Sequence, residues 1–182
     1  LNAGSKLTYP KKFSMKNREV YLTGEAYFKV VHNDKHSFVV HTPEADIKDL
    51  GTTFNVKAYT GNATTETTLI EGSVEIILKN NPSQKILIQP KEKFVLHNQQ
   101  PIGDKIKEHS SKPIFKISKI IRFSQTNDII ETAWISDKLI FRSQRFEDLA
   151  KEMERRYNVT IIVGDEDIKG YQLTGIFKNE SI

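Results

Sequence analysis

The side chains in this sequence that are able to do chemistry include one pair of histidines and one pair of glutamates. His32 and His36 are four residues apart, a spacing that on a helix would place both imidazoles on one face. They flank Asn33-Asp34-Lys35, which is typical of a turn, so a solvated loop is favoured over a metal site. Glu25 and Glu71 each adjoin a glycine. Two carboxylates roughly 5–10 Å apart would serve glycoside hydrolysis, but a carboxylate that hydrogen-bonds backbone at a strand bend is the favoured interpretation.

The remaining inventory of reactive groups is small. The acidic run at 165–167 is typical of a solvated loop, with weak cation binding as its alternative. The sequence contains no Gly-x-Ser-x-Gly, no phosphate-binding loop and no His-Glu-x-x-His. It contains no cysteine, which excludes disulfides, thiol catalysis and cysteine-ligated metal centres. We therefore expect no catalytic residue, no metal and no cofactor, and a protein that is not an enzyme.

Composition narrows the class of protein further. The chain has 182 residues and a net charge of +4, from 27 Lys and Arg against 23 Asp and Glu. A nucleic-acid partner would need clustered charge rather than this near balance, so we expect none. The basic stretch from Lys112 to Arg122 fits an edge strand guarded by lysines as well as it fits a nucleic-acid or membrane contact. No apolar run approaches the roughly 20 residues of a membrane span.

The first part of the chain is patterned as short strands. Apolar residues alternate from Val20 to Val30, and Gly24 in that pattern indicates a bend. Further strand patterns lie at 38–40, 45–47, 56–58, 69–78, 86–88 and 94–96. Strands of this length, with turn signals about every ten residues, predict a sandwich, roll or barrel. Residues 98–112 are predicted to form a linker.

The hydrophobic period changes after this linker. One helical stripe is formed by Phe146, Leu149, Ala150, Met153 and Tyr157. Asn158 follows as a left-handed cap. Residues 139–141 and 159–163 are predicted strands on either side of the helix, and 171–177 are another. This is a small α/β unit, so the sequence predicts two domains, at 1–125 and 126–182.

Five blocks of the first domain occur in a fixed order. They read Leu-Asn-Ala-Gly-Ser at 1–5, Arg-Glu-Val at 18–20 with Gly-Glu-Ala-Tyr-Phe at 24–28, Phe-x-Val-His-Thr-Pro at 38–43, Leu-Gly-Thr-Thr-Phe-Asn-Val at 50–56 and Leu-Ile-Glu-Gly-Ser-Val at 69–74. This series resembles the FecR family of anti-sigma factors, in the form common among Bacteroidetes. Trp134, Leu-x-Phe at 139–141, Phe-x-x-Leu at 146–149, Glu-Arg-Arg-Tyr-Asn-Val at 154–159 and Leu-Thr-Gly-x-Phe at 173–177 are similar to the small domain that follows.

Three positions depart from the pattern of that family. Lys91 stands in a turn that usually reads Pro-Gly-Glu, and Asp137 stands where Gly is frequent after Trp. Arg156 stands where Trp is frequent before the Tyr. We expect these departures to change turn details and a surface rather than the fold.

The resemblance implies a fold that is mainly β with a small α/β part. The first domain is expected to be a jelly-roll-like antiparallel β structure. The second is expected to be a βαβ-type unit similar to half of the secretin/TonB short N-terminal fold. Both ends of the sequence are patterned as though cut, so we expect each domain to be truncated at its outer end.

The same resemblance implies a function. FecR proteins are single-pass inner-membrane proteins whose cytoplasmic segment holds an extracytoplasmic-function sigma factor. Their periplasmic part receives a signal from the signalling domain of a TonB-dependent outer-membrane transducer. This chain is then expected to be periplasmic, without the membrane helix or the sigma-binding segment, and to relay the signal by protein contact without catalysis.

We expect that contact to use strand addition at exposed edges of the second domain. The candidate residues are Leu139, Phe141, Arg155, Arg156, Tyr157, Leu173 and Phe177. In the alternative, Tyr157 closes the core and the arginines only cap the helix. A second hypothesis is a carbohydrate- or small-ligand-binding β module, which requires Tyr21, Tyr27 and Tyr59 to be exposed together beside polar groups.

Overall fold

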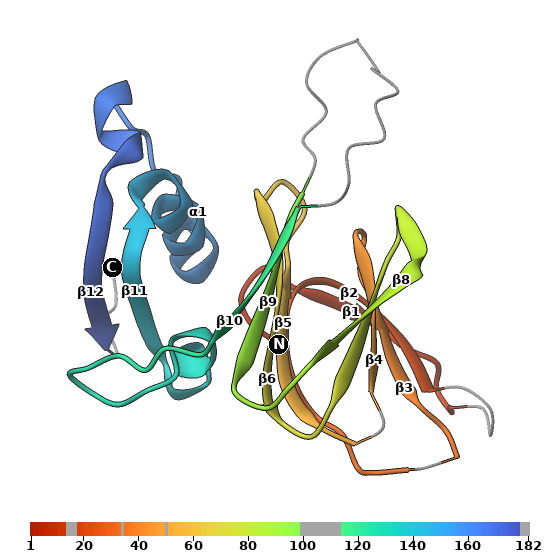
Figure 1. The fold of residues 1–182 in the computed structure, drawn as a ribbon. Coiled ribbons are helices and arrows are strands. Elements are labelled where there is room, and N and C mark those ends of the chain that lie inside the picture. Colours follow the sequence, from red (N-terminus) through yellow and green to blue (C-terminus); the bar gives the residue numbers. More distant parts are fainter. Residues whose placement is uncertain (14–17, 34, 50, 99–113, 179–182) are drawn as a thin grey trace, which may run out of the picture. The chain divides into compact units, whose positions relative to one another are not determined.

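A computed structural model of the chain describes residues 1–13, 18–33, 35–49, 51–98 and 114–178 (Figure 1). The chain divides into two compact units. The first holds Leu1 and Ser5–Ile120, and the second holds Asn2–Gly4 and Ile121–Ile182. Residues 99–112 of the predicted linker lie outside the described residues.

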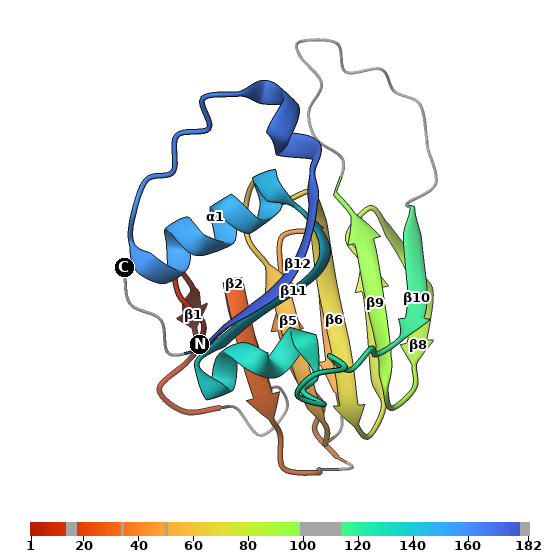
Figure 2. The same ribbon diagram turned by 90° about the vertical axis from the view of Figure 1, so that its left-hand side faces the viewer.

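Strand β2 (Arg18–Lys29) organises the first unit because both halves of the sheet meet on it. Its first half pairs with β1 (Lys6–Thr8) and β3 (Phe38–His41), and its second half pairs with β5 (Thr53–Ala58). The remaining strands are β4 (Ala45–Asp49), β6 (Thr64–Glu71), β7 (Val74–Leu78), β8 (Asn81–Ile88), β9 (Glu92–His97) and β10 (Phe115–Lys119). The strand order is β10-β9-β6-β5-β2-β3-β4-β7-β8. This sheet curls until β8 approaches β9, so the first unit is nearly a barrel (Figures 1 and 2).

The bend in β2 lies at Gly24, as the sequence predicts. Gly24 has a φ of +112°, a conformation that residues with a side chain rarely adopt. A Cβ atom at this position would lie 2.6 Å from Cα of Ser5. The hydroxyl of Ser5 accepts the N–H of Glu25 at 2.8 Å, which fixes the strand directly after the bend. A glycine is therefore required where β2 passes from one half of the sheet to the other.

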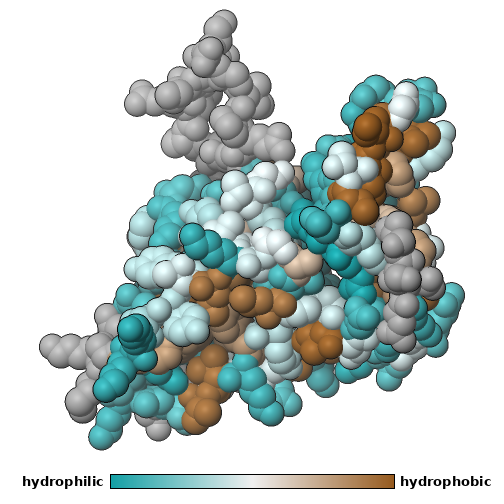
Figure 3. Space-filling model, turned by 180° about the vertical axis from the view of Figure 1, so that it is seen from behind, coloured by the Kyte–Doolittle hydropathy of each residue, from teal (hydrophilic) through white to brown (hydrophobic). Residues whose placement is uncertain are grey.

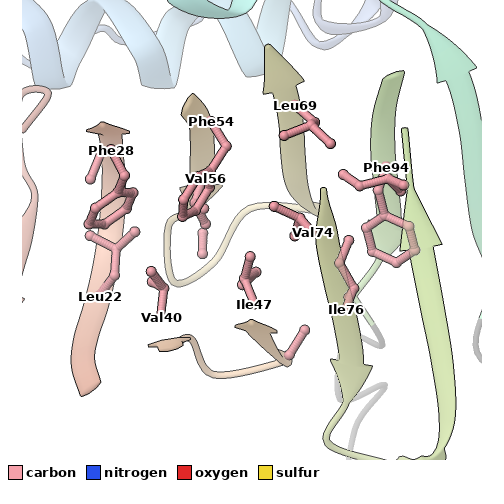
Figure 4. Packing of buried hydrophobic residues seen from close by; sticks show 14 of the residues in the cluster. Leu22, Phe28, Val40, Ile47, Phe54, Val56, Leu69, Val74, Ile76 and Phe94 are labelled. Atoms are coloured by element: carbon pink, nitrogen blue, oxygen red, sulfur yellow. The ribbon is translucent and has the colours of Figure 1, made fainter. Parts of the chain in front are cut away.

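The core of the first unit fills the space between the two halves of the curled sheet. Alternate residues point inward, such as Ile47 on β4 and Ile76 on β7, and both are fully buried. The ring of Phe28 stacks on that of Phe54, with centroids 5.1 Å apart. Figure 4 shows these side chains converging from strands that are distant in sequence. Each such residue contributes about 1.5–3 kcal/mol through burial.

The second unit is built on two antiparallel strands, β11 (Lys138–Arg145) and β12 (Gln172–Lys178). Leu139 and Phe141 face helix α1 (Phe146–Tyr157) and pack on Leu149. Ile140 faces the other way and packs on Phe123 and Ala133, beside the 3-10 helix η1 (Ile130–Ser136). A second 3-10 helix, η2 (Glu166–Gly170), precedes β12. The two strands thus carry a small core on each face.

The fold class is confirmed: the protein is mainly β with a small α/β part. Details differ from the sequence-based expectation. β2 and β3 pair in parallel within an otherwise antiparallel first unit. In the second unit the order strand–helix–strand is present, but β11 and β12 are antiparallel. The strand predicted at 159–163 was wrong, because this segment has no neighbouring strand to pair with among the described residues.

The surface is mixed rather than uniformly polar. Seen from behind, hydrophobic side chains lie in separate groups among hydrophilic ones (Figure 3). Among the described residues, no helix combines the length and the apolar character that crossing a bilayer requires.

The bend at Gly24 predicts a large difference between two glycine substitutions. Gly24→Ala should lower the free energy of unfolding by more than about 2 kcal/mol. The new Cβ would lie too close to the backbone of Ser5, and an alanine would be strained at this positive φ. Gly61→Ala is the matched control: its φ is +83°, and no atom lies within 4 Å of the position a Cβ would take. It should cost only about 1 kcal/mol. Denaturant unfolding of the two variants measures the difference; equal losses would show that Ser5 does not constrain the bend.

Candidate protein-interaction surface of the second unit

The two strands of the second unit leave main-chain groups available for a partner. Among the described residues, β11 and β12 pair only with each other, so each strand has one unpaired edge. β12 begins with three exposed residues, Gln172, Leu173 and Thr174. An unpaired edge of this kind is a ready template for a strand from another chain.

The edge of β11 is less regular than that of β12. The pairing passes from Phe141 opposite Gly175 to Gln144 opposite Leu173, so one extra residue is accommodated in a bulge. Ser143 in this bulge has a φ of +45°, and its N–H donates to the hydroxyl of Thr174 at 2.9 Å. Bulges and charged residues discourage strand addition, and Arg142 is exposed here. The outer edge of β12 is therefore the better acceptor of the two.

Three of the predicted contact residues lie in the core. Leu139 and Phe141 are buried, and Phe141 packs on Phe177 with ring centroids 5.5 Å apart. The absence of a side chain at Gly175 leaves space for the ring of Phe141, since a Cβ there would lie 2.8 Å from that ring. Leu173 is exposed over about a third of its surface (37%). The structure thus brings Leu139, Phe141 and Phe177 together beneath α1 and leaves Leu173 accessible.

The other three predicted residues form the last turn of α1. Nη2 of Arg156 donates to Oδ1 of Asp137 at 2.6 Å, and its guanidinium lies 5.7 Å from the ring centroid of Tyr157. Arg155 and Tyr157 are half-buried. Asn158 ends the helix in the left-handed conformation, with a φ of +52°, as the sequence predicts. Arg156 therefore connects the end of α1 to the residue that ends η1.

The ion pair between Arg156 and Asp137 was missed by sequence reasoning. Each residue stood out alone as a departure from the family pattern, and they are 19 positions apart. Asp137 has a φ of +55°, where Gly is unstrained and Asp is tolerated. Their opposite charges were the only signal in the sequence that could have joined them.

Two carboxylates of this unit, those of Asp128 and Glu147, have lowered pKa values. The Lys138 ammonium donates to Oδ2 of Asp128 at 2.7 Å, and this hydrogen bond is the main reason that the pKa of Asp128 is lowered. Lys151 donates to Oε1 of Glu147 at 3.1 Å and likewise lowers the pKa of Glu147. When ionised, both carboxylates stabilise the folded state. This stabilisation is fully present at pH values above the ordinary carboxyl pKa, and it is lost as the pH falls through the lowered pKa values.

The alternative candidate residues in the first unit are dispersed. Tyr21 is exposed over 56% of its surface and stacks on His41, whereas Tyr59 is buried. Tyr27 lies on the second half of β2, where burial and then Glu71 raise the pKa of its phenol. The exposed group of tyrosines that a carbohydrate site requires is therefore not formed by these three residues.

The paired acids and histidines do not converge either. Glu25 is buried and accepts from the amide of Asn55 at 2.8 Å, whereas Glu71 is exposed. Glu25 and Glu71 each lie opposite a residue of β5. Those two β5 residues are four positions apart, which is roughly 13 Å along a strand. The N–H of His36 donates to the side chain of Asn33 at 3.1 Å in a turn. The described part of the chain holds no group of three or more His, Asp or Glu side chains suited to a metal ion.

The two remaining charged segments have local structural roles. Oδ1 of Asp165 accepts the N–H of Asp167 at 2.9 Å at the start of η2. In the basic stretch, β10 pairs only with β9 among the described residues, and Lys119 forms an ion pair with Glu92 at 2.9 Å. An edge strand guarded by lysines is thus what the structure has here.

Comparison with known proteins identifies the family of this fold. The family model described as FecR protein matches residues 1–75, and the model described as FecR, C-terminal, matches residues 138–182. No curated protein matches the chain. The chain belongs to the FecR family, with the two parts of that family in order along one polypeptide.

Two solved structures are similar along the whole chain. Both are crystal structures of "a putative anti-sigma factor" from Parabacteroides distasonis, at 1.65 and 2.50 Å resolution. Each is 27% identical to this chain and covers 100% of it, with TM-scores of 0.81 and 0.80. The match covers 76% and 75% of those chains. The arrangement of strands in both units is thus shared with a protein of that description.

The contact between Arg156 and Asp137 predicts a measurable coupling. Arg156→Met should lower the stability of the second unit by about 1 kcal/mol, since it removes both the ion pair and the stacking on Tyr157. In an Asp137→Asn background the same substitution should cost about 0.5 kcal/mol less. A double-mutant cycle followed by denaturant unfolding measures this difference, and additive effects would contradict the pairing.

The carboxylate next to Lys151 gives a second test within this unit. Lys151→Met should raise the pKa of Glu147 toward its ordinary value of 4.5, because the hydrogen bond that lowers it is gone. Lys169→Met is the control, since Lys169 is the weakest of the groups acting on Glu147. NMR titration of the Glu147 carboxyl follows both variants. A midpoint that stays unchanged in Lys151→Met would refute the assignment.

Proposed function

We propose that this protein is the sensor part of a transmembrane anti-sigma factor. It relays a signal from a TonB-dependent outer-membrane transducer to an extracytoplasmic-function sigma factor. The observation that carries this proposal is the order of the two FecR matches on one chain. It is supported by the fold shared over the full length with a protein described as an anti-sigma factor.

The proposed location is the periplasm. The family supports a membrane anchor and a cytoplasmic segment that holds the sigma factor, both in parts of the protein outside this sequence. The relay works by protein contact, without catalysis and without nucleic acid. The dispersion of Glu25 and Glu71 and of the tyrosines supports contact rather than chemistry.

The second unit is proposed to dock the signalling domain of the transducer. Unpaired strand edges supply main-chain N–H and C=O groups in a fixed spacing, and a partner strand can satisfy them. Leu139, Phe141 and Phe177 pack in the core and fix the position of β11 and β12. Leu173 on β12 presents an exposed side chain to the partner. Arg155, Arg156 and Tyr157 contribute from the end of α1.

A binding measurement tests the proposal. Isothermal titration of the whole chain with the purified N-terminal signalling domain of the transducer should give a dissociation constant below about 100 μM. Leu173→Asp should weaken binding several-fold without changing the melting temperature, because this side chain is exposed. Leu87→Asp, at an exposed site of the first unit, is the control and should bind normally. Absence of binding by the folded wild-type chain would overturn the proposed relay.

A further inference from the structure

The segment 159–163 has the composition of a strand but lacks a strand partner. It reads Val-Thr-Ile-Ile-Val, five consecutive β-branched residues, which are the residues most enriched in sheets. It follows the C-cap of α1 and runs to Gly164. Among the described residues it pairs with neither β11 nor β12. A segment with high strand propensity therefore pairs with no strand that the structure describes.

One side of this segment is already used by helix α1. The N–H of Val159 donates to the backbone oxygen of Glu154 at 3.3 Å. The N–H of Ile161 donates to Oε1 of Glu154 at 2.8 Å. Both odd-numbered amides thus point to the end of α1, which fixes the segment along one side.

The other side of the segment is open. In an extended chain, alternate residues direct their N–H and C=O groups to opposite sides. Thr160 and Ile162 alternate with the two residues whose N–H groups bind Glu154, and within the described residues no hydrogen bond reaches either of them. Ile162 is also 88% exposed, the most exposed of the large hydrophobic residues that the structure describes. The main-chain groups of Thr160 and Ile162 and the side chain of Ile162 are therefore available to a partner strand.

This edge lacks the features that protect other edges. β11 has a bulge and exposed arginine, and β10 carries lysines. The segment 159–163 has no charge, no Pro and no Gly. Edges that are neither bulged nor charged are the ones that accept a further strand. The segment is therefore a second candidate acceptor edge of this unit, in addition to the outer edge of β12.

The charge beside the segment indicates which strand would fit. Asp165, Glu166 and Asp167 follow directly and are exposed. Glu166 is neutralised by Lys169, whose Nζ lies 2.6 Å from Oε1. Among the described residues neither Asp165 nor Asp167 has an ion-pair partner, and Oδ1 of Asp165 accepts the N–H of Asp167. Their negative charges favour a partner strand that carries Lys or Arg next to the paired residues.

We infer that 159–163 is a strand-acceptor edge for a basic-flanked strand of the transducer's signalling domain. This inference rests on the proposed function and adds a second contact for the same partner, in addition to the edge of β12 that carries Leu173. The incoming strand pairs with the main-chain groups of Thr160 and Ile162 and covers the side chain of Ile162. Its basic residues lie against Asp165 and Asp167.

Hydrogen exchange and proline substitution test this assignment on the whole chain. In the complex with the purified signalling domain, the amides of Thr160 and Ile162 should exchange at least about tenfold more slowly than in the free chain. Ile162→Pro removes one of these donors and should weaken binding at least about tenfold. Thr160→Val, which keeps the backbone, is the matched control and should bind like wild type. Asp167→Lys should slow association several-fold at low salt.

The possible outcomes separate this inference from the proposal beneath it. Failure of the wild-type chain to bind the signalling domain overturns the proposed function itself. Normal binding by Ile162→Pro, with unchanged exchange at Thr160 and Ile162, overturns only the acceptor edge. Slow exchange at these amides in the free chain also overturns it, because a second copy or another part of the same protein then covers the edge; sedimentation distinguishes these two. Thermal melting verifies that Ile162→Pro is folded.

Discussion

The passage of one strand through both halves of a sheet is the constraint on which the first unit depends. β2 can pair with β3 on one side of its bend and with β5 on the other only because Gly24 adopts a φ of +112°. Ser5 occupies the space that a side chain on residue 24 would need, and its hydroxyl accepts a hydrogen bond from the N–H of Glu25. The bend brings two sets of alternating apolar residues face to face. A closed core with few reactive groups is the result.

The second unit follows a different principle. Two paired strands cannot bury a large core, so each face carries a small cluster, one under α1 and one beside η1. Among the described residues, this arrangement leaves main-chain groups unpaired at the edges of β11 and β12, which is a liability for a protein without partners. In a protein that transmits signals by contact, the same groups supply the docking surface. The first unit is thus nearly closed, and the second is the unit that we propose for docking.

Sequence patterns anticipated the parts of this structure that depend on local chemistry. The bend at Gly24 and the left-handed cap at Asn158 follow from the conformational preferences of single residues. The stripe from Phe146 to Tyr157 became α1. The resemblance to the FecR family, which depends on blocks spread over the chain, was confirmed by the comparisons.

Interactions between distant residues were beyond the reach of such patterns. The composition of 159–163 is that of a strand, but a strand exists only where a partner lies beside it, and the sequence does not contain that information. The same limit hid the pairing of Arg156 with Asp137. The most direct test of the relay by contact is an NMR titration of the isotope-labelled chain with the unlabelled signalling domain of the transducer. We predict reversible shift changes concentrated between residues 158 and 178, with no change in the mass of either protein. Changes confined to the first unit, or a covalent modification, would contradict the account.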